Sequence, residues 1–182
     1  MFSKEKLRKK FIKLRRLKYF SVENKVFKPL LNLIIKTKRK KISFYYPSNY
    51  EFNTLKLFKI LKKKKKIKTL LPVILTNKSM KFVSWRDFDP LFVNKFGFLE
   101  PRVNKNEIIP DLILVPIVAY DKLKNRLGYG KGYYDRILKQ LVKKNPNIIT
   151  VGLAFSFQKY KKIPISKLDM KLNYILTEKG LY

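Results

Sequence analysis

The sequence predicts an α/β fold in three layers, in which a mostly parallel β-sheet is flanked by helices on both faces. Two observations support this prediction. Amphipathic helical segments alternate with short apolar segments that favour strands, and the 182 residues are enough for one domain with a sizeable core. Ligands bind such sheets beyond the carboxyl ends of the strands, so functional residues are expected at that edge. We therefore expect residues 1–182 to form a single domain.

The first part of the chain is predicted to be mainly helical. Apolar residues from Leu7 to Leu17 recur at spacings of three and four, which gives residues 3–19 one apolar face on an otherwise basic helix. Residues 22–36 predict a second helix. Pro29 lies inside this segment and is expected to kink or break it, because proline lacks the backbone N–H that a helix interior needs.

The rest of the chain alternates strands with helices. A segment rich in aromatic and β-branched residues ends at Pro47, and residues 86–110 contain glycine and prolines typical of loops. The predicted strands are 41–46, 69–75, Met80–Ser84, 111–115, 148–155 and Tyr174–Thr177, and the further predicted helices are 53–62 and Tyr133–Lys144.

The composition excludes several classes of chemistry. The chain has no cysteine and no histidine, so disulfides, thiolate nucleophiles and imidazole bases or metal ligands are absent. No apolar run approaches the ~20 residues that span a bilayer, and the N-terminus lacks the apolar core of a signal peptide. Catalysis must therefore use carboxylates, lysines, tyrosines, backbone groups and a hard metal ion. We expect a cytoplasmic protein without a membrane partner.

The formal charge of +32 has two explanations. It comes from 44 basic and 12 acidic residues, and such a surface attracts nucleic acid or anionic membranes. The same excess of Lys over Arg, with abundant Ile, Asn, Phe and Tyr, is also what A/T-rich coding would produce. We favour the coding explanation and expect no specific nucleic-acid partner, although weak RNA binding at low salt follows from charge alone.

The most informative segment is residues 126–136, Arg-Leu-Gly-Tyr-Gly-Lys-Gly-Tyr-Tyr-Asp-Arg. Alternating glycines allow backbone N–H groups to approach an anion closely, and Lys131 adds a positive charge. The following helix would present its N-terminus to the same anion. The spacing fits neither the Walker pattern nor the dinucleotide fingerprint. A ligand-free turn is the alternative, but it does not explain three glycines, a lysine and a Tyr-Tyr-Asp sequence together.

Residues 111–121 and 125–136 together resemble the signature of the 5-formyltetrahydrofolate cyclo-ligases, also called methenyltetrahydrofolate synthetases. Further similarities occur in family order along nearly the whole chain. They are Lys4 and Arg8, residues 46–54, Leu71-Pro72, residues 80–82, Glu100-Pro101, residues 152–158, Ile163-Pro164, Asp169 and Thr177-Glu178.

The resemblance implies an ATP-dependent ring closure with Mg²⁺. The formyl oxygen of 5-formyltetrahydrofolate would be phosphorylated, N10 would attack the activated carbon, and phosphate would leave. The products would be 5,10-methenyltetrahydrofolate, ADP and phosphate. Phosphoryl transfer depends mainly on positioning and charge neutralisation, so a chain without His or Cys can perform it. We expect a monomer. The alternatives are a basic RNA-binding protein and a non-catalytic folate- or nucleotide-binding protein.

The resemblance also implies roles for individual residues. Lys131 and Arg126 would be catalytic, Tyr46 and Glu51 would bind the folate, and Asp135 and Asp169 would hold Mg²⁺. The nucleotide would be bound by Lys4, Arg8, Arg126, Leu127, Gly128, Tyr129, Gly130, Lys131, Gly132, Tyr133 and Tyr134.

Each role has a simpler alternative. Lys4 and Arg8 could be part of an ordinary basic helix face, and Glu51 could be an exposed turn residue. Asp135 could pair with Arg136 or Lys139. Asp169 could cap a turn. Phe96 is a further candidate for contact with the pterin, but such a residue is more often simply part of the core. Asn173 replaces an Asp of many relatives, which could weaken the metal site.

Overall fold

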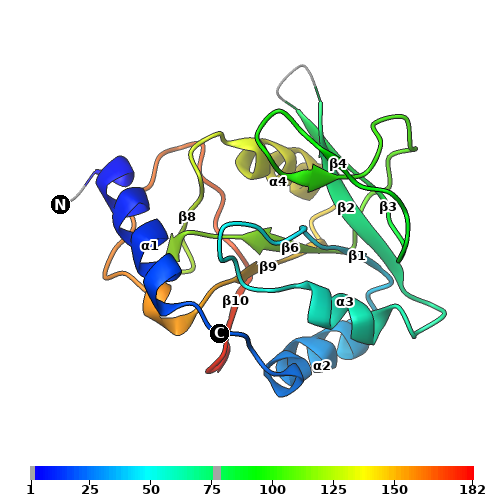
Figure 1. Cartoon of the computed structure of the whole chain (residues 1–182), viewed down its shortest axis with the longest axis horizontal. Coiled ribbons are helices and arrows are strands. Elements are labelled where there is room, and N and C mark those ends of the chain that lie inside the picture. The colour runs from blue at the N-terminus through cyan, green and yellow to red at the C-terminus, as the bar shows by residue number, and fades with distance from the viewer. Residues whose placement is uncertain (1–2, 76–78) are drawn as a thin grey trace.

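A seven-stranded sheet forms the middle layer of the computed structural model, which describes residues 3–75 and 79–182 (Figure 1). The strand order is β11-β10-β9-β6-β1-β2-β3, and the five central strands run parallel. Only the edge strands β11 and β3 pair antiparallel with their neighbours. The predicted three-layer, mostly parallel α/β fold is therefore confirmed.

The elements follow the predicted order, and two strands, β1 and β9, are shorter than predicted. The helices are α1 (Lys4–Lys18), α2 (Lys28–Lys36), α3 (Leu55–Leu61) and α4 (Tyr133–Lys144), with short 3₁₀ turns at Asn24–Phe27 and Ser156–Gln158. The strands of the main sheet are β1 (Lys41–Ser43), β2 (Lys68–Ile74), β3 (Met80–Ser84), β6 (Leu112–Pro116), β9 (Ile149–Leu153), β10 (Tyr174–Thr177) and β11 (Gly180–Leu181). Two small hairpins are formed by β4 (Phe92–Val93) with β5 (Leu99–Glu100) and by β7 (Ala119–Tyr120) with β8 (Arg126–Leu127).

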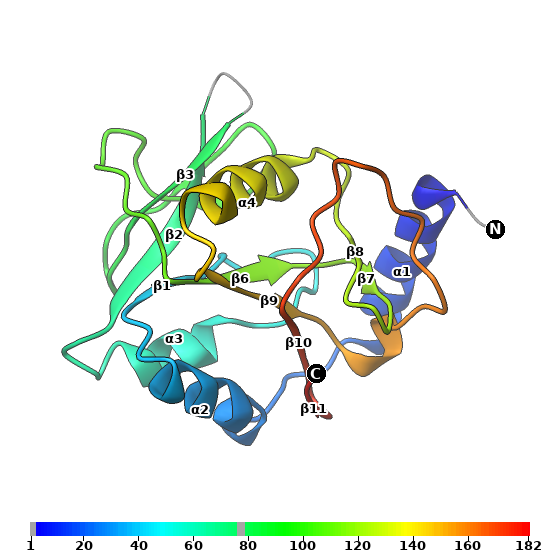
Figure 2. The same cartoon turned by 180° about the vertical axis from the view of Figure 1, so that it is seen from behind.

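The helices cover both faces of the sheet and one end of it. Helices α2 and α3 lie on one face and α4 on the other, while α1 packs beside β7 and β8 (Figures 1 and 2). The apolar face predicted for the first helix is buried over its first part, since Leu7 and Phe11 pack in one cluster with Leu127, whereas Leu17 at its end is 72% exposed. Helix α1 is thereby fixed next to the strand that leads into the glycines.

The second predicted helix is divided in two. A 3₁₀ turn at Asn24–Phe27 precedes α2, and Pro29 lies in the first turn of α2. Backbone N–H groups in the first turn of a helix have no acceptor within the helix. Proline, which lacks this N–H, therefore fits at the start of α2 and would not fit in its interior. The predicted break is real, and it falls just before the proline.

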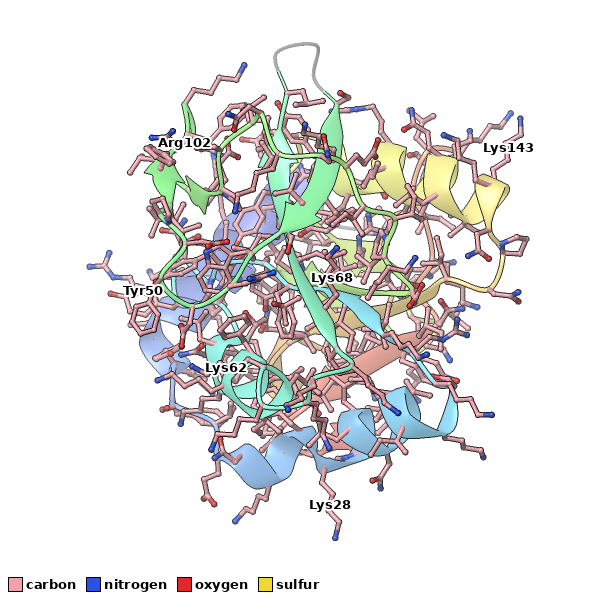
Figure 3. All side chains as sticks on the ribbon, turned by 90° about the vertical axis from the view of Figure 1, so that its right-hand side faces the viewer. Lys28, Tyr50, Lys62, Lys68, Arg102 and Lys143 are labelled. Carbon is pink, nitrogen blue, oxygen red and sulfur yellow. The ribbon has the colours of Figure 1, made fainter. Side chains whose placement is uncertain are left out.

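Basic side chains are distributed over the outside of the molecule. Figure 3 shows Lys28 on α2 and Lys143 on α4 pointing away from the ribbon, and both are exposed. In the described part of the chain, no helix is long and apolar enough to cross a membrane. Most of the aromatic rings in the main apolar cluster, such as Phe27 and Phe44, are buried, so they are core residues and do not offer stacking surfaces for bases.

Candidate active site

A cavity of about 790 Å³ lies at the carboxyl edge of the sheet. Ile74 and Pro116, the last residues of β2 and β6, line it, which is the position expected for a ligand site in a parallel sheet. Its volume is within the ~300–1,000 Å³ typical of small-molecule pockets. Every residue that the sequence assigned to the site lines this cavity: Lys4, Arg8, Tyr46, Glu51, residues 126–134, Asp135 and Asp169.

The glycines adopt backbone conformations that side chains resist. Gly130 has φ +95° and Gly132 has φ +69°, and Gly132 is the N-cap of α4. A Cβ atom on Gly130 would lie 3.1 Å from the guanidinium carbon of Arg8, so a larger residue there would have to shift Arg8 by a few tenths of an ångström and would also strain φ. The loop connects the short strand β8, which pairs with β7 outside the main sheet, to the N-terminus of α4. Backbone N–H groups and the positive end of the helix dipole are thus available to an anion in the cavity.

Basic side chains from α1 and from the loop itself surround the glycines. Arg8 donates a hydrogen bond from Nε to the Gly128 carbonyl oxygen at 2.8 Å. Lys131 is exposed, and its Nζ lies 5.7 Å from the centroid of the Phe96 ring. Phe96 itself is half-buried and makes an edge contact with Tyr133. The phosphates of a ligand in the cavity would therefore lie next to the positive charges of Arg8 and Lys131, which are already in place before the ligand binds.

The two candidate metal ligands are both engaged with basic residues. Asp135 accepts a hydrogen bond from Arg126 Nη2 at 2.6 Å, so it is engaged by a residue other than the two that the simpler alternative named. Asp169 pairs with Lys4 and also accepts from the Ser166 backbone N–H, as the turn-cap alternative expects. The Lys4 contact contributes to a lowered pKa of Asp169, against the opposing effect of burial. Lys4 and Arg126 are therefore held by carboxylates at the same cavity wall.

Asp135 and Asp169 could bind Mg²⁺ only together with oxygen atoms of a bound substrate. Within residues 3–75 and 79–182, no cluster of three or more Asp, Glu, Cys or His could hold a metal by itself. Asp135 binds its partners through Oδ1 and Asp169 through Oδ2, which leaves one oxygen of each carboxylate. Mg²⁺ is commonly bound by one or two carboxylates together with substrate phosphates. The residues present fit that arrangement.

Glu51 is a buried carboxylate and not the exposed turn residue of the simpler alternative; it is only 6% exposed. Its Oε1 accepts from the Tyr129 hydroxyl at 2.5 Å, and its Oε2 accepts from the Ser48 backbone N–H at 2.9 Å. Burial raises the pKa of Glu51, while the hydrogen bond from Tyr129, those from Ser48, and the charge of Arg15 partly counteract it. Burial likewise raises the pKa of Tyr45, which lies beside Glu51.

Sequence reasoning missed Arg15, which is 1% exposed on α1. Its Nη2 donates to the Tyr129 hydroxyl oxygen at 2.6 Å. A signal was present, because Leu7 and Phe11 are buried at a spacing of four and Arg15 is the next position of that stripe. A basic residue at a buried stripe position indicates a partner inside the protein.

Asn173, which the family resemblance singled out as a departure, is not among the residues that line the cavity. Its side-chain oxygen accepts from the backbone N–H and the hydroxyl of Thr150, both at 2.8 Å. The residue therefore ties β9 to the segment before β10, and its substitution leaves the carboxylates of the cavity unchanged.

Comparisons with known proteins agree with this geometry. The model of the 5-formyltetrahydrofolate cyclo-ligase family matches residues 2–178. A 5-formyltetrahydrofolate cyclo-ligase of Haemophilus influenzae is 34% identical over 176 residues, which is 93% of this chain and 92% of that protein. The solved 5,10-methenyltetrahydrofolate synthetase of Aquifex aeolicus superposes with a TM-score of 0.79 at 31% identity, covering 98% of this chain and 91% of that one. The solved 5,10-methenyltetrahydrofolate synthetase of Mycoplasma pneumoniae superposes with a TM-score of 0.75 at 26% identity, covering 97% of this chain and 99% of that one.

Proposed function

Because the chain belongs to the 5-formyltetrahydrofolate cyclo-ligase family, we propose that it closes 5-formyltetrahydrofolate to 5,10-methenyltetrahydrofolate at the expense of ATP. The observation that carries the proposal is a direct contact between the glycine loop (residues 128–132) and the part of the cavity wall that contains Glu51. Tyr129 belongs to the glycine loop, and its hydroxyl is hydrogen-bonded to the buried Glu51 carboxylate. A nucleotide phosphate at the loop and a folate at Glu51 would therefore be neighbours, as direct phosphoryl transfer requires.

The nucleotide is proposed to lie along the glycine loop. Backbone N–H groups of residues 128–132 would face the phosphates, and Arg8 and Lys131 would supply positive charge. Arg126 is buried and paired with Asp135, so its role would be to position that carboxylate beside the phosphates. When bound, Mg²⁺ would neutralise phosphate charge from the oxygens of Asp135 and Asp169.

The folate is proposed to lie against Glu51 and Tyr46. An ionised carboxylate only accepts hydrogen bonds, and it complements the donor-rich edge of a pterin. Glu51 is held on both oxygens by Tyr129 and Ser48, so it would meet the ring in a fixed orientation. Phe96, half-buried at the cavity wall, offers an aromatic face in the same space.

The proposed reaction has two balanced steps. The formyl oxygen attacks the γ-phosphorus of ATP, the bond to the bridging oxygen breaks, and ADP leaves. N10 then attacks the formyl carbon and loses its proton, and the carbon–oxygen bond breaks to release phosphate. Lys131 and the loop N–H groups would stabilise the charge that develops on the transferred phosphoryl group.

The predictions of a monomer, of a cytoplasmic location and of no specific nucleic-acid partner stay predictions. A basic RNA-binding function is the second candidate from the sequence, and the burial of most aromatic rings in the main apolar cluster keeps those rings from stacking on bases.

The test is an absorbance assay for methenyltetrahydrofolate with purified protein, ATP, Mg²⁺ and 5-formyltetrahydrofolate. An ATP-dependent rise is expected. Lys131→Ala should slow it by about 10- to 1,000-fold, as the loss of one charge-stabilising group does elsewhere. Lys143→Ala, an exposed lysine at the far end of α4, is the matched control and should react like the wild type. Binding of folate without any ATP-dependent turnover would instead support a non-catalytic folate-binding protein.

A further inference from the structure

Arg15 is a buried charge that the proposed reaction has not yet used. In the described part of the chain it forms no direct ion pair with a carboxylate, and its Nε has no hydrogen-bond partner. Its guanidinium carbon lies 5.6 Å from the centroid of the Tyr129 ring, while Nη2 donates to the hydroxyl of the same residue. A guanidinium taken out of water without a carboxylate in contact is costly, so a residue of this kind needs a specific reason.

The nearest counter-charge is Glu51, one hydroxyl group away. The Tyr129 hydroxyl accepts from Arg15 at 2.6 Å and donates to Glu51 Oε1 at 2.5 Å. The three side chains come from α1, from the glycine loop and from the segment after β1. They form one continuous chain of hydrogen bonds from the N-terminal helix to the wall of the folate side of the cavity.

Helix α1 also holds the glycine loop at a second point. Arg8 donates to the Gly128 carbonyl oxygen, and Arg15 donates to the side chain of the next residue, Tyr129. The two arginines are seven residues apart, which is about two helical turns and the same helix face. Arg8 lines the cavity, whereas Arg15 does not and touches the loop through Tyr129.

We propose that Arg15 is a positioning residue for the folate substrate, which acts through the Tyr129 hydroxyl to keep the Glu51 carboxylate ionised and fixed toward the cavity. The inference rests on the proposed function, because it assigns Glu51 to folate binding. Its physical basis is the balance of charge around Glu51. Burial favours the protonated carboxyl group, which would donate one hydrogen bond, whereas a pterin edge needs an acceptor.

Arg15 supplies the positive charge in that balance. Among residues 3–75 and 79–182, the hydroxyls of Tyr45, Tyr129 and Tyr134 also interact with Glu51, and none of these three carries a positive charge. Burial raises the pKa of Tyr129, so its hydroxyl stays protonated and transmits the interaction as a hydrogen bond. Removal of the Arg15 charge would shift Glu51 further toward its protonated form.

The experiment measures calorimetric binding of 5-formyltetrahydrofolate, and separately of a non-hydrolysable ATP analogue, over a range of pH. The variants are Arg15→Met, Arg15→Lys and Tyr129→Phe, and the matched control is Arg16→Met, because Arg16 is the adjacent, exposed arginine of the same helix. Arg15→Met should weaken folate binding at neutral pH by about tenfold or more, and should move the loss of binding to higher pH. Arg16→Met should match the wild type, and the ATP analogue should be affected much less than the folate.

The remaining variants separate positioning from folding. Arg15→Lys keeps the charge, so it should retain the wild-type pH profile with a smaller loss of affinity. Tyr129→Phe should weaken folate binding as Arg15→Met does, and the double variant should lose little more, because both changes interrupt one chain of interactions. If Arg15→Met does not fold, the same measurements on Arg15→Lys and Tyr129→Phe test the proposal.

Two results would overturn the inference. One is equal folate affinity of Arg15→Met and Arg16→Met. The other is an equal loss of folate and nucleotide binding with an unchanged pH profile, which is what a purely structural arginine would give. A wild-type protein that does not bind 5-formyltetrahydrofolate at all would reject the proposed function itself, so the two failures are distinguishable.

Discussion

Replacement of Gly130 by alanine tests whether the glycine loop and helix α1 act as one unit. The residue has φ +95°, and the new Cβ would lie 3.1 Å from the Arg8 guanidinium carbon. The φ strain alone should cost about 1–2 kcal/mol. Displacement of Arg8 would also weaken its hydrogen bond to the Gly128 carbonyl, which is worth about 1–2 kcal/mol for a partly exposed charged donor. The expected decrease in the free energy of unfolding is therefore about 2–4 kcal/mol.

Gly97→Ala is the matched control. Gly97 has φ +79°, but no atom would lie within 4 Å of an added Cβ. This variant should therefore lose only the ~1–2 kcal/mol of unfolding free energy that the φ strain costs. Urea unfolding gives both free energies, and calorimetry with an ATP analogue gives the second readout. Gly130→Ala should weaken nucleotide binding by about tenfold, equivalent to ~1.4 kcal/mol, because Arg8 is displaced. The reasoning fails if the two variants lose equal stability and Gly130→Ala binds the nucleotide like the wild type.

Three further predictions use buried groups. Gly152→Ala should destabilise by about 1–3 kcal/mol without changing substrate KM, because its Cβ would lie 2.7 Å from Leu172 Cδ1 in the core; wild-type stability in urea would contradict this. Tyr134→Phe should stabilise the ligand-free protein by about 1–3 kcal/mol, because its buried hydroxyl has no partner among the described residues; a lower thermal midpoint than the wild type would argue against it. The pKa of Glu51 is raised in the folded state, so its contribution to stability is greatest below its unfolded pKa and is lost as pH rises through the folded pKa. Glu51→Gln should remove that loss, so the stability of the variant relative to the wild type should increase from acidic to neutral pH in urea unfolding; a constant difference would show that Glu51 is not the titrating group.

Local patterns were enough to predict most of the architecture. The apolar spacing of α1 and the apolar segment at β6 depend on residues close in sequence, and the alternation of helices with strands then implied a parallel sheet. Strand ends were less well predicted, and β1 ends at Ser43, three residues before the predicted end. The glycine loop was recognisable from sequence because backbone freedom and helix start are encoded locally.

The sequence by itself determined the α/β class and the glycine loop, and its family resemblance named many of the residues that line one cavity. Only the tertiary structure decided how those residues are paired. Tyr129 meets Glu51 across 78 residues of chain, Arg15 meets Tyr129 across 114, and Lys4 meets Asp169 across 165. Contacts over such separations depend on how the layers pack, and local propensity carries no information about them. The spacing of α1 could indicate that Arg15 is buried, but only the fold shows that its partner is Tyr129.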